Sequence, residues 1–389
     1  MIWFVLGREY KLSVAEILAV FPKWKTAYLS KDVLILDNLE KKEVLEKANT
    51  LWWTIKIIEI SPPPSGTPLD KGKNEIVDDA LIHEWKFKYW ISIYWEKKNL
   101  KEILIKQKKE LKSEGISSRF VNKDFKNLSS AQIIWEKLIK RWTDYSIICD
   151  WFWKSIWIQD INAYSKRDFS KDRDMQVGML PPKLCQMMIN ISWWSIVYDP
   201  FVWLWTILIE SINMWNKKVY GTDLSERMVE ISTNNINEFI KSHNINIEKA
   251  DIKKLNAKFI EESEILANNK IDSIVSEWYL WEMMTKKNIS LDRIEKQRKS
   301  LSELYIKFFE WLQKTNYSWN LVMCFPFWEM KWKFVYFTEI YDILNKYCIV
   351  EWFFPSDNEE IETTRSGSLL YKRPLQLVGR EIFKLKIKQ

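Results

Sequence analysis

Acidic residues stand after three successive apolar segments in the second half of the chain. Asp199 follows the segment that begins at Ile196, Asp223 comes 24 positions later, and Asp251 follows the next such segment. Because the carboxyl ends of parallel strands meet at one edge of a sheet, we expect the three carboxylates to converge there. One carboxylate can accept both hydroxyls of a ribose, and another can accept a hydrogen bond from an adenine amine. Each residue alone fits a helix cap, but the set is better explained by a nucleoside ligand.

The residues after Asp199 lie between a predicted strand and a predicted helix, and run Pro200-Phe201-Val202-Trp203-Leu204-Trp205-Thr206. With glycine at positions 203 and 205 the segment becomes an acidic residue followed by Gly-x-Gly, which lets the backbone approach a ligand and turn into the helix. With tryptophan at both positions, we expect the two indoles to fill the space that the ligand would occupy. A dinucleotide-binding fold is the competing interpretation, but it requires a third glycine where Ile207 or Leu208 stands.

The chain is rich in tryptophan and poor in glycine, with 24 Trp and 8 Gly. Glycine usually makes up about 7% of a protein, which predicts roughly 27 here, and the two types together come close to that number. Tryptophans also stand in predicted turns, at Trp52-Trp53, Trp151, Trp193-Trp194 and Trp319. Our hypothesis is that most of them come from a recoded UGA codon that the organism decodes as glycine. The alternative is a Trp-rich protein, whose aromatic patches would follow helical or strand periods instead of turns.

A fourth predicted strand ends in Ser276-Glu277-Trp278-Tyr279. An exocyclic amine is a poor nucleophile because its lone pair is delocalised into the ring. A carboxylate that holds the amine and an aromatic ring that stacks on the base can align that lone pair with a methyl donor, and such positioning accelerates reactions. We therefore predict that Glu277 and Tyr279 are catalytic. The alternative is a strand-end glutamate on the surface beside a packed tyrosine.

Stretches spread over nearly the whole chain resemble the THUMP-domain tRNA guanine-N2 methyltransferase family, of archaeal and eukaryotic type. They are Phe4–Glu9, Leu51–Ile57, Gly115–Val121 with Leu128–Ala131, Arg173–Asp174 with Gly178–Leu184, and Arg373–Pro374 with Val378–Glu381. Glycine in place of tryptophan improves the match repeatedly. The family's catalytic motif is Asp-Pro-Pro-Tyr; here Glu277 matches the acidic position, and both prolines are missing.

The resemblance implies an S-adenosyl-L-methionine-dependent enzyme that methylates the N2 amine of a guanosine in tRNA. The cofactor-binding residues that it implies, together with the acidic pattern, are Asp199, Pro200, Phe201, Trp203, Trp205, Thr206, Asp223, Asp251 and Ser276. An rRNA guanine-N2 methyltransferase is a near variant. Two alternatives come from other classes: a nucleic-acid-binding protein with a decayed methyltransferase domain, and a methyltransferase for DNA or small-molecule amines.

The order of predicted elements indicates an α/β fold. Strands and helices alternate from about residue 181, which is typical of a mostly parallel, doubly wound, Rossmann-like sheet. The last strands would add an antiparallel edge to this sheet. In the chain before the Rossmann-like domain we expect an α+β region with a THUMP-like module. The predicted domains are a ferredoxin-like region at 1–60, the THUMP-like module at 67–165 and the methyltransferase domain at 170–389. Among the elements, we predict a helix over 13–21 capped by Ser13, and a strand over 246–250 that ends before Asp251.

Composition favours a polyanionic partner, since the net charge is +7. Arg119, Lys123 and Lys126 are predicted RNA-binding residues, with tRNA or another structured RNA as the partner. The lysines between 97 and 109 fit phosphate contacts and a solvated helix face equally well. Four scattered cysteines and two histidines argue against a metal site and for a reducing cytoplasm. The longest apolar stretch is interrupted by charges, so we expect no membrane span, and we expect a monomer.

Overall fold

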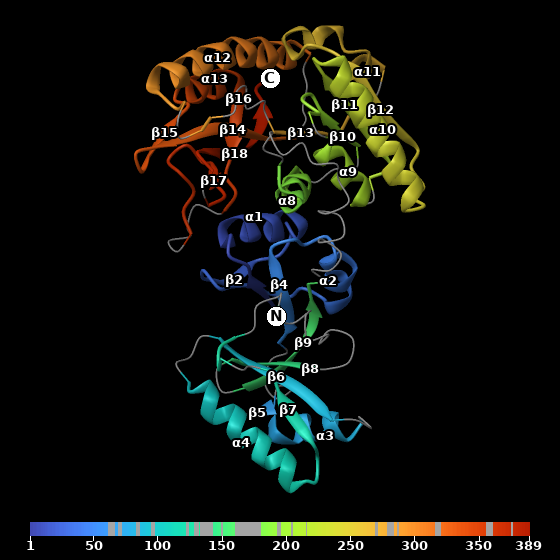
Figure 1. Cartoon of the computed structure of the whole chain (residues 1–389), viewed down its shortest axis with the longest axis vertical. Helices are drawn as coiled ribbons and strands as arrows, with labels where there is room; N and C mark the ends of the chain where they lie inside the picture. Colours follow the sequence, from blue (N-terminus) through green and yellow to red (C-terminus); the bar gives the residue numbers. More distant parts are fainter. Residues whose placement is uncertain are drawn as a thin grey trace. The chain divides into compact units, whose positions relative to one another are not determined.

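The computed structural model describes residues 1–60, 67–68, 72–82, 86–94, 98–121, 124–127, 132, 143–148, 151–159, 180–192, 196–203, 205–214, 216–268, 271–277, 284–285, 288–315, 320–354, 361–374 and 376–389. The chain divides into two compact units (Figure 1). Unit 1 consists of Met1–Ser13 and Lys23–Asp172, and unit 2 of Val14–Pro22 and Arg173–Gln389. Residues 166–169, which separate the predicted THUMP-like module from the predicted methyltransferase domain, lie outside the described residues.

Unit 1 is built on one sheet with the strand order β2-β3-β1-β4-β9-β8-β6-β7, and β5 pairs with β9 beside this path. Its strands are β1 (Ile2–Leu6), β2 (Thr26–Leu29), β3 (Val33–Leu36), β4 (Thr54–Glu59), β5 (Thr67–Pro68), β6 (Phe87–Tyr94), β7 (Ser118–Phe120), β8 (Thr143–Ile148) and β9 (Trp151–Ile158). Its helices are α2 (Lys41–Ala48), α3 (Gly72–Leu81) and α4 (Leu100–Ser113), whereas α1 (Tyr10–Val20) begins in unit 1 and belongs to unit 2 from Val14 on. β1 and β3 are buried along their whole length, because almost all of their side chains are apolar and join the core.

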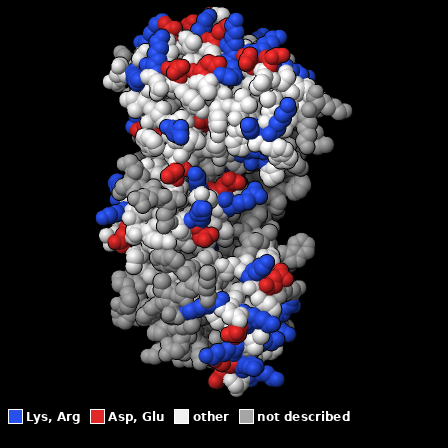
Figure 2. All heavy atoms as spheres, turned by 90° about the vertical axis from the view of Figure 1, so that its left-hand side faces the viewer, with Lys and Arg blue, Asp and Glu red and all other residues white. Residues whose placement is uncertain are grey.

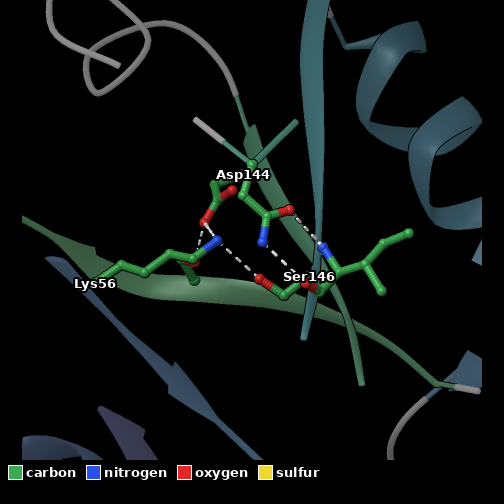
Figure 3. A network of polar contacts seen from close by, with 6 residues as sticks. Lys56, Asp144 and Ser146 are labelled. Atoms are coloured by element: carbon green, nitrogen blue, oxygen red, sulfur yellow. Dashed lines mark hydrogen bonds and ion pairs between the residues drawn. The ribbon is translucent and has the colours of Figure 1, made fainter. Parts of the chain in front are cut away.

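A buried ionic network ties the middle of this sheet together (Figure 3). The Lys56 ammonium on β4 lies 2.7 Å from the Asp144 carboxylate on β8 and 2.9 Å from the Ser146 hydroxyl. Both charged side chains are 1% exposed. Ser155 on β9 also donates to Asp144, and the ring of Tyr94 lies under the ammonium at 5.0 Å from its centroid. The network therefore connects strands whose residues are 88 to 90 positions apart in the sequence.

Unit 2 contains a doubly wound sheet with the order β12-β11-β10-β13-β14-β18-β16. The first five strands are parallel to one another, and β18 runs antiparallel to β14 and β16. Its strands are β10 (Ile196–Asp199), β11 (Lys218–Asp223), β12 (Lys249–Lys254), β13 (Ser273–Glu277), β14 (Asn320–Met330), β15 (Lys333–Tyr336), β16 (Cys348–Glu351), β17 (Leu369–Tyr371) and β18 (Val378–Ile387). The predicted Rossmann-like fold class is confirmed, including its antiparallel edge.

Helices cover both faces of this sheet (Figure 1). They are α8 (Pro182–Ser192), α9 (Thr206–Asn213), α10 (Glu226–Ser242), the 3-10 helix η1 (Ala257–Glu262), α11 (Glu264–Asn268), α12 (Leu291–Lys314) and α13 (Glu339–Tyr347). Alternating residues of β10 and β11 explain the two layers: Tyr198 and Tyr220 pack with α12 and α13, whereas Val219 packs with α9 and α10. Strands buried on both faces are typical of parallel sheets.

Two predicted boundaries are wrong. The first helix begins at Tyr10 instead of Ser13, because Ser13 is a fully buried residue inside α1 and not its cap. The third strand of unit 2 covers Lys249–Lys254 instead of 246–250. The alternating Asn and Ile residues before it form a connection in which Asn244 has a positive φ of 50°. In the part of the chain described above, no helix is long and apolar enough to cross a membrane.

Candidate cofactor-binding site

The loop between β10 and α9 has left-handed backbone at both tryptophans. Trp203 has φ 43° and Trp205 has φ 53°, in the region that only glycine adopts without a steric penalty. The loop is held in place by its own backbone: Val202 donates to the Thr222 carbonyl at 3.0 Å, and Trp205 donates to the Val202 carbonyl at 2.8 Å. The backbone at 203 and 205 therefore has the conformation that a Gly-x-Gly loop requires.

The expectation that the two indoles fill the ligand pocket stays a prediction, and the structure shows where each of them packs. Trp205 is 2% exposed and packs among apolar residues of α9, α10 and β11, such as Leu208, Ile236 and Val219. Trp203 is half-buried against the same cluster. A large apolar side chain gains most from burial between helices and sheet, which is where Trp205 lies.

A third tryptophan with positive φ lies in the turn between β14 and β15. Met330 pairs with Lys333 there, so Lys331 and Trp332 form a two-residue hairpin loop, with φ 48° and 66°. Positive φ at both central residues is the type I′ requirement, which favours glycine at the second position. Trp332 is 93% exposed, so packing does not compensate for its backbone. Three of the seven described non-glycine residues with positive φ are thus tryptophan.

Asp199 ends β10 as predicted, and its carboxylate is buried. One oxygen accepts hydrogen bonds from the Phe201 amide at 3.0 Å and from the Ser276 hydroxyl at 2.6 Å. Burial raises the pKa of Asp199 to about 7; the two hydrogen bonds oppose this, and the carboxylates of Asp223 and Glu277 add to it. The structure thus brings Ser276 and Asp199 together, two residues that the sequence placed in one site.

Asp223 ends β11 and closes the loop from the other side. Its two oxygens accept from the Trp203 amide at 2.9 Å and from the Ser225 amide at 2.8 Å. Burial raises the pKa of Asp223, and these two amide donors oppose that effect. Each carboxylate oxygen can accept one more hydrogen bond, so Asp223 orders the loop and keeps capacity for a ligand's hydroxyls. The next residue, Leu224, is 62% exposed and was missed by the sequence analysis.

Asp251 does not end its strand, contrary to the prediction. It is the third residue of β12, in register with Tyr220 of β11, whereas Lys254 is the residue opposite Asp223. Its carboxylate lies 3.5 Å from the Lys249 ammonium and is 25% exposed. An adenine-binding role for Asp251 therefore stays a prediction. Asp199 and Asp223, in contrast, lie at the ends of their strands, as expected.

Glu277 ends β13, and its carboxylate forms an ion pair with Arg380 of β18. The Arg380 Nε donates to Glu277 Oε1 at 2.5 Å, and the side chains are 2% and 16% exposed. Burial raises the pKa of Glu277, against the attraction of Arg380 and Arg373. Tyr279, the second predicted catalytic residue, lies outside the described residues. Arg380 was not predicted to lie here, because its contact with Glu277 spans 103 positions and depends on the register between β14 and β18.

Basic and aromatic side chains meet in unit 1. Phe120 and Phe125 contact each other with ring centroids 6.1 Å apart, and the Lys108 and Lys101 ammonium groups lie over them at 5.7 and 5.4 Å. Arg119 lies beside Phe120 on β7, and of the other predicted RNA-binding residues Lys126 is exposed and Lys123 lies outside the described residues. Figure 2 shows acidic side chains among the basic ones on the face of the molecule that it draws, so charge alone does not assign an RNA surface.

Comparison with known proteins finds no matching family model and no matching curated protein. Similar solved structures include TrmN from Thermus thermophilus, with 12% identity, 100% of each chain covered and a TM-score of 0.49. A possible methylase from Clostridium difficile 630 and SMU.472, a putative methyltransferase complexed with SAH, both have 11% identity. They cover 98% of this chain and 97% of their own, with TM-scores of 0.44 and 0.41. At such identities the roles of residues must come from the site itself.

Proposed function

We propose that the chain transfers the methyl group of S-adenosyl-L-methionine to the exocyclic N2 amine of a guanosine in tRNA. The observation that carries the proposal is the group of carboxylates from Asp199, Asp223 and Glu277 at the carboxyl edge of a doubly wound sheet. In such sheets, ligands bind at this edge, where the strand order reverses between β10 and β13. The resemblance of the sequence to guanine-N2 methyltransferases supports the choice of base.

The residues at this edge fit the cofactor. Asp223 has acceptor capacity for the two ribose hydroxyls, and the exposed Leu224 offers an apolar surface to a purine ring. Asp199, held by Ser276, provides negative charge for the cationic methionine end. When bound, the cofactor supplies an electrophilic methyl group, whose transfer leaves a neutral thioether and releases one proton from the amine.

Glu277 has the position and environment to act on that amine. Its Oε1 is held by Arg380, which orients the carboxylate and leaves Oε2 to accept a hydrogen bond from the base. Burial raises the pKa of Glu277 and so makes it a better acceptor for the released proton. Holding the amine in line with the methyl group supplies the remaining acceleration by positioning.

The test is transfer of labelled methyl groups to total tRNA, followed by nucleoside analysis. The protein is made full-length with the substitutions W203G and W205G, because glycine is the hypothesised residue at both positions. We expect N2-methylguanosine in the tRNA fraction. Label in rRNA would move the target, label in DNA or a small amine without RNA would change the substrate class, and no N2-methylguanosine in any RNA refutes the proposal.

Equilibrium binding of S-adenosylmethionine separates the enzyme from a nucleic-acid-binding protein with a decayed methyltransferase domain. We expect binding by the starting protein and a large loss with Asp223→Ala. Asp342→Ala, which removes an exposed carboxylate from α13, serves as the matched control and should bind as the starting protein does. Absence of binding, or equal binding by the Asp223→Ala protein, would favour the decayed domain.

A further inference from the structure

The guanidinium of Arg380 is buried but only partly used. Its Nε donates to Glu277, and its Nη1 reaches Gln376 Oε1 at the long distance of 3.5 Å. Its Nη2 is buried and has no hydrogen-bond partner in the part of the chain that the structure describes. Leaving a charged donor buried without an acceptor is costly, and such groups in native proteins call for a physical explanation.

Arg380 lies at the edge where the proposed cofactor site lies. On β14, Pro326 is the residue opposite Arg380, and Cys324 is the residue opposite Glu277. Because β14 runs parallel to β13, Arg380 is located two positions beyond the level at which β13 ends. The carboxylate and the guanidinium are therefore neighbours at the carboxyl edge, one from the last residue of β13 and one from the start of β18.

This pair offers hydrogen-bond acceptors next to a donor. The Watson–Crick edge of guanine carries the complementary set: a keto oxygen that accepts a hydrogen bond, and a ring N–H and an amine that donate hydrogen bonds. Enzymes that act on bases recognise them through this edge. We propose that Arg380 Nη2 donates to the six-keto oxygen of the target guanine while Glu277 Oε2 accepts from its ring N–H and amine, so that Arg380 determines base specificity.

This assignment rests on the proposed function and extends it to the choice between purines. An adenine in the same place presents an amine to the guanidinium, so two donors face each other and the acceptor site is lost. Arg380 has a second effect as a positioning residue, since its Nε fixes Glu277. A lysine at 380 keeps the charge next to Glu277 but lacks the fork that reaches two acceptors at once.

The experiment compares Arg380→Lys with the starting protein, both full-length with W203G and W205G. The substrate is the tRNA that accepts label in the total-tRNA assay, prepared with guanosine or with 2-aminopurine at the labelled position. The 2-aminopurine base keeps the N2 amine but lacks the keto oxygen. We expect the kcat/KM of the starting protein to be roughly 10- to 100-fold higher for guanosine than for 2-aminopurine, which is the range for a hydrogen bond from a charged donor. Arg380→Lys should lower kcat/KM for guanosine by a similar factor and change the 2-aminopurine substrate little.

Because 2-aminopurine also lacks the ring N–H in both arms, only the change in the ratio reports on Arg380. If Arg380→Lys lowers kcat/KM equally for both substrates, the ratio of the two values is unchanged. That result indicates a purely structural role for Arg380 and overturns the inference. If Arg380→Lys fails to fold, the starting protein still offers a refutation: a preference for guanosine below about threefold means that neither the keto oxygen nor the ring N–H is recognised, and it overturns the inference. Arg298→Lys is the matched control. Arg298 of α12 pairs with Glu339 of α13, and this substitution should leave kcat/KM unchanged for both substrates. If no RNA accepts label, the proposed function itself has failed, which is a different result.

Discussion

Replacing Lys56 with methionine tests how much the buried network of unit 1 contributes to stability. The substitution removes the ammonium that lies 2.7 Å from Asp144 and leaves that carboxylate 1% exposed (Figure 3). Ser155 still donates to Asp144, but no cation in the described part of the unit would remain hydrogen-bonded to it. Removing one partner of a buried pair typically costs about 3–5 kcal/mol. We expect a loss of this size for Lys56→Met, and a similar loss for Asp144→Leu, which leaves the ammonium buried.

The double substitution Lys56→Met/Asp144→Leu distinguishes a lost pair from lost packing. Replacing both charges by apolar groups of similar volume is often neutral or stabilising. We therefore expect the double variant to unfold within about 1 kcal/mol of the parent, far from the sum of the single effects. Lys154→Met is the matched control in the same sheet: its ammonium pairs with Asp79 but is 44% exposed, so the loss should stay below about 1 kcal/mol.

Urea unfolding of the full chain gives the free energies, and hydrogen exchange of peptides from β4 and β8 assigns the change to unit 1. A loss below about 1 kcal/mol for Lys56→Met would refute the network's importance. A double variant as unstable as the sum of the single variants would show that the side chains matter through shape and not through their mutual charge.

Three further outcomes are expected. Trp332→Gly should raise the free energy of unfolding by about 0.5–1 kcal/mol, because relief of a left-handed backbone outweighs the entropy of glycine; Trp332→Ala keeps the Cβ and should gain nothing in thermal unfolding. S-adenosylmethionine should bind more tightly as pH rises from 6 to 8, because Asp199, with its pKa near 7, is neutral below that value and charged above it. Titration calorimetry of Asp199→Asn should show a flat pH profile, and a parent profile that is already flat would contradict the assignment. Asp223→Asn should weaken cofactor binding while leaving the circular dichroism spectrum unchanged, whereas an altered spectrum would indicate that Asp223 serves the fold alone.

Periodicity predicted most of the sheet in unit 2, because strands buried on both faces are apolar runs with clear ends. It failed where a local signal was overridden. Ser13 has the chemistry of a helix cap, but α1 continues past it because burial of Ser13 and its neighbours in the helix dominates. The hairpin of β14 and β15 was not predicted at all, since Lys331-Trp332 lacks the glycine that announces such a turn.

The candidate site shows the same division between local and distant information. Asp199 and Asp223 were predictable, because each follows its own strand and the fold brings strand ends together. Asp251 was misplaced, because the strand ends three residues later, at Lys254, and no local pattern corrects such an error. Arg380 was out of reach for another reason: its contact with Glu277 exists only because β18 returns antiparallel to β14 in a particular register.

Three tryptophans with left-handed backbone connect the unpredicted turn with the hypothesis that UGA codons are decoded as glycine. Trp205 is buried, Trp203 is half-buried and Trp332 is exposed, so burial is not what they share; their backbone conformation is. Genuine aromatic patches would share burial and differ in backbone. At roughly 1–2 kcal/mol each, three such residues cost about 3–6 kcal/mol, a large part of the net stability of a typical protein. Glycine removes that cost at all three positions and restores both the loop after Asp199 and the missing turn signal. The codons decide it: UGG at 203, 205 and 332 would mean that the protein carries this strain, and UGA would mean that it does not.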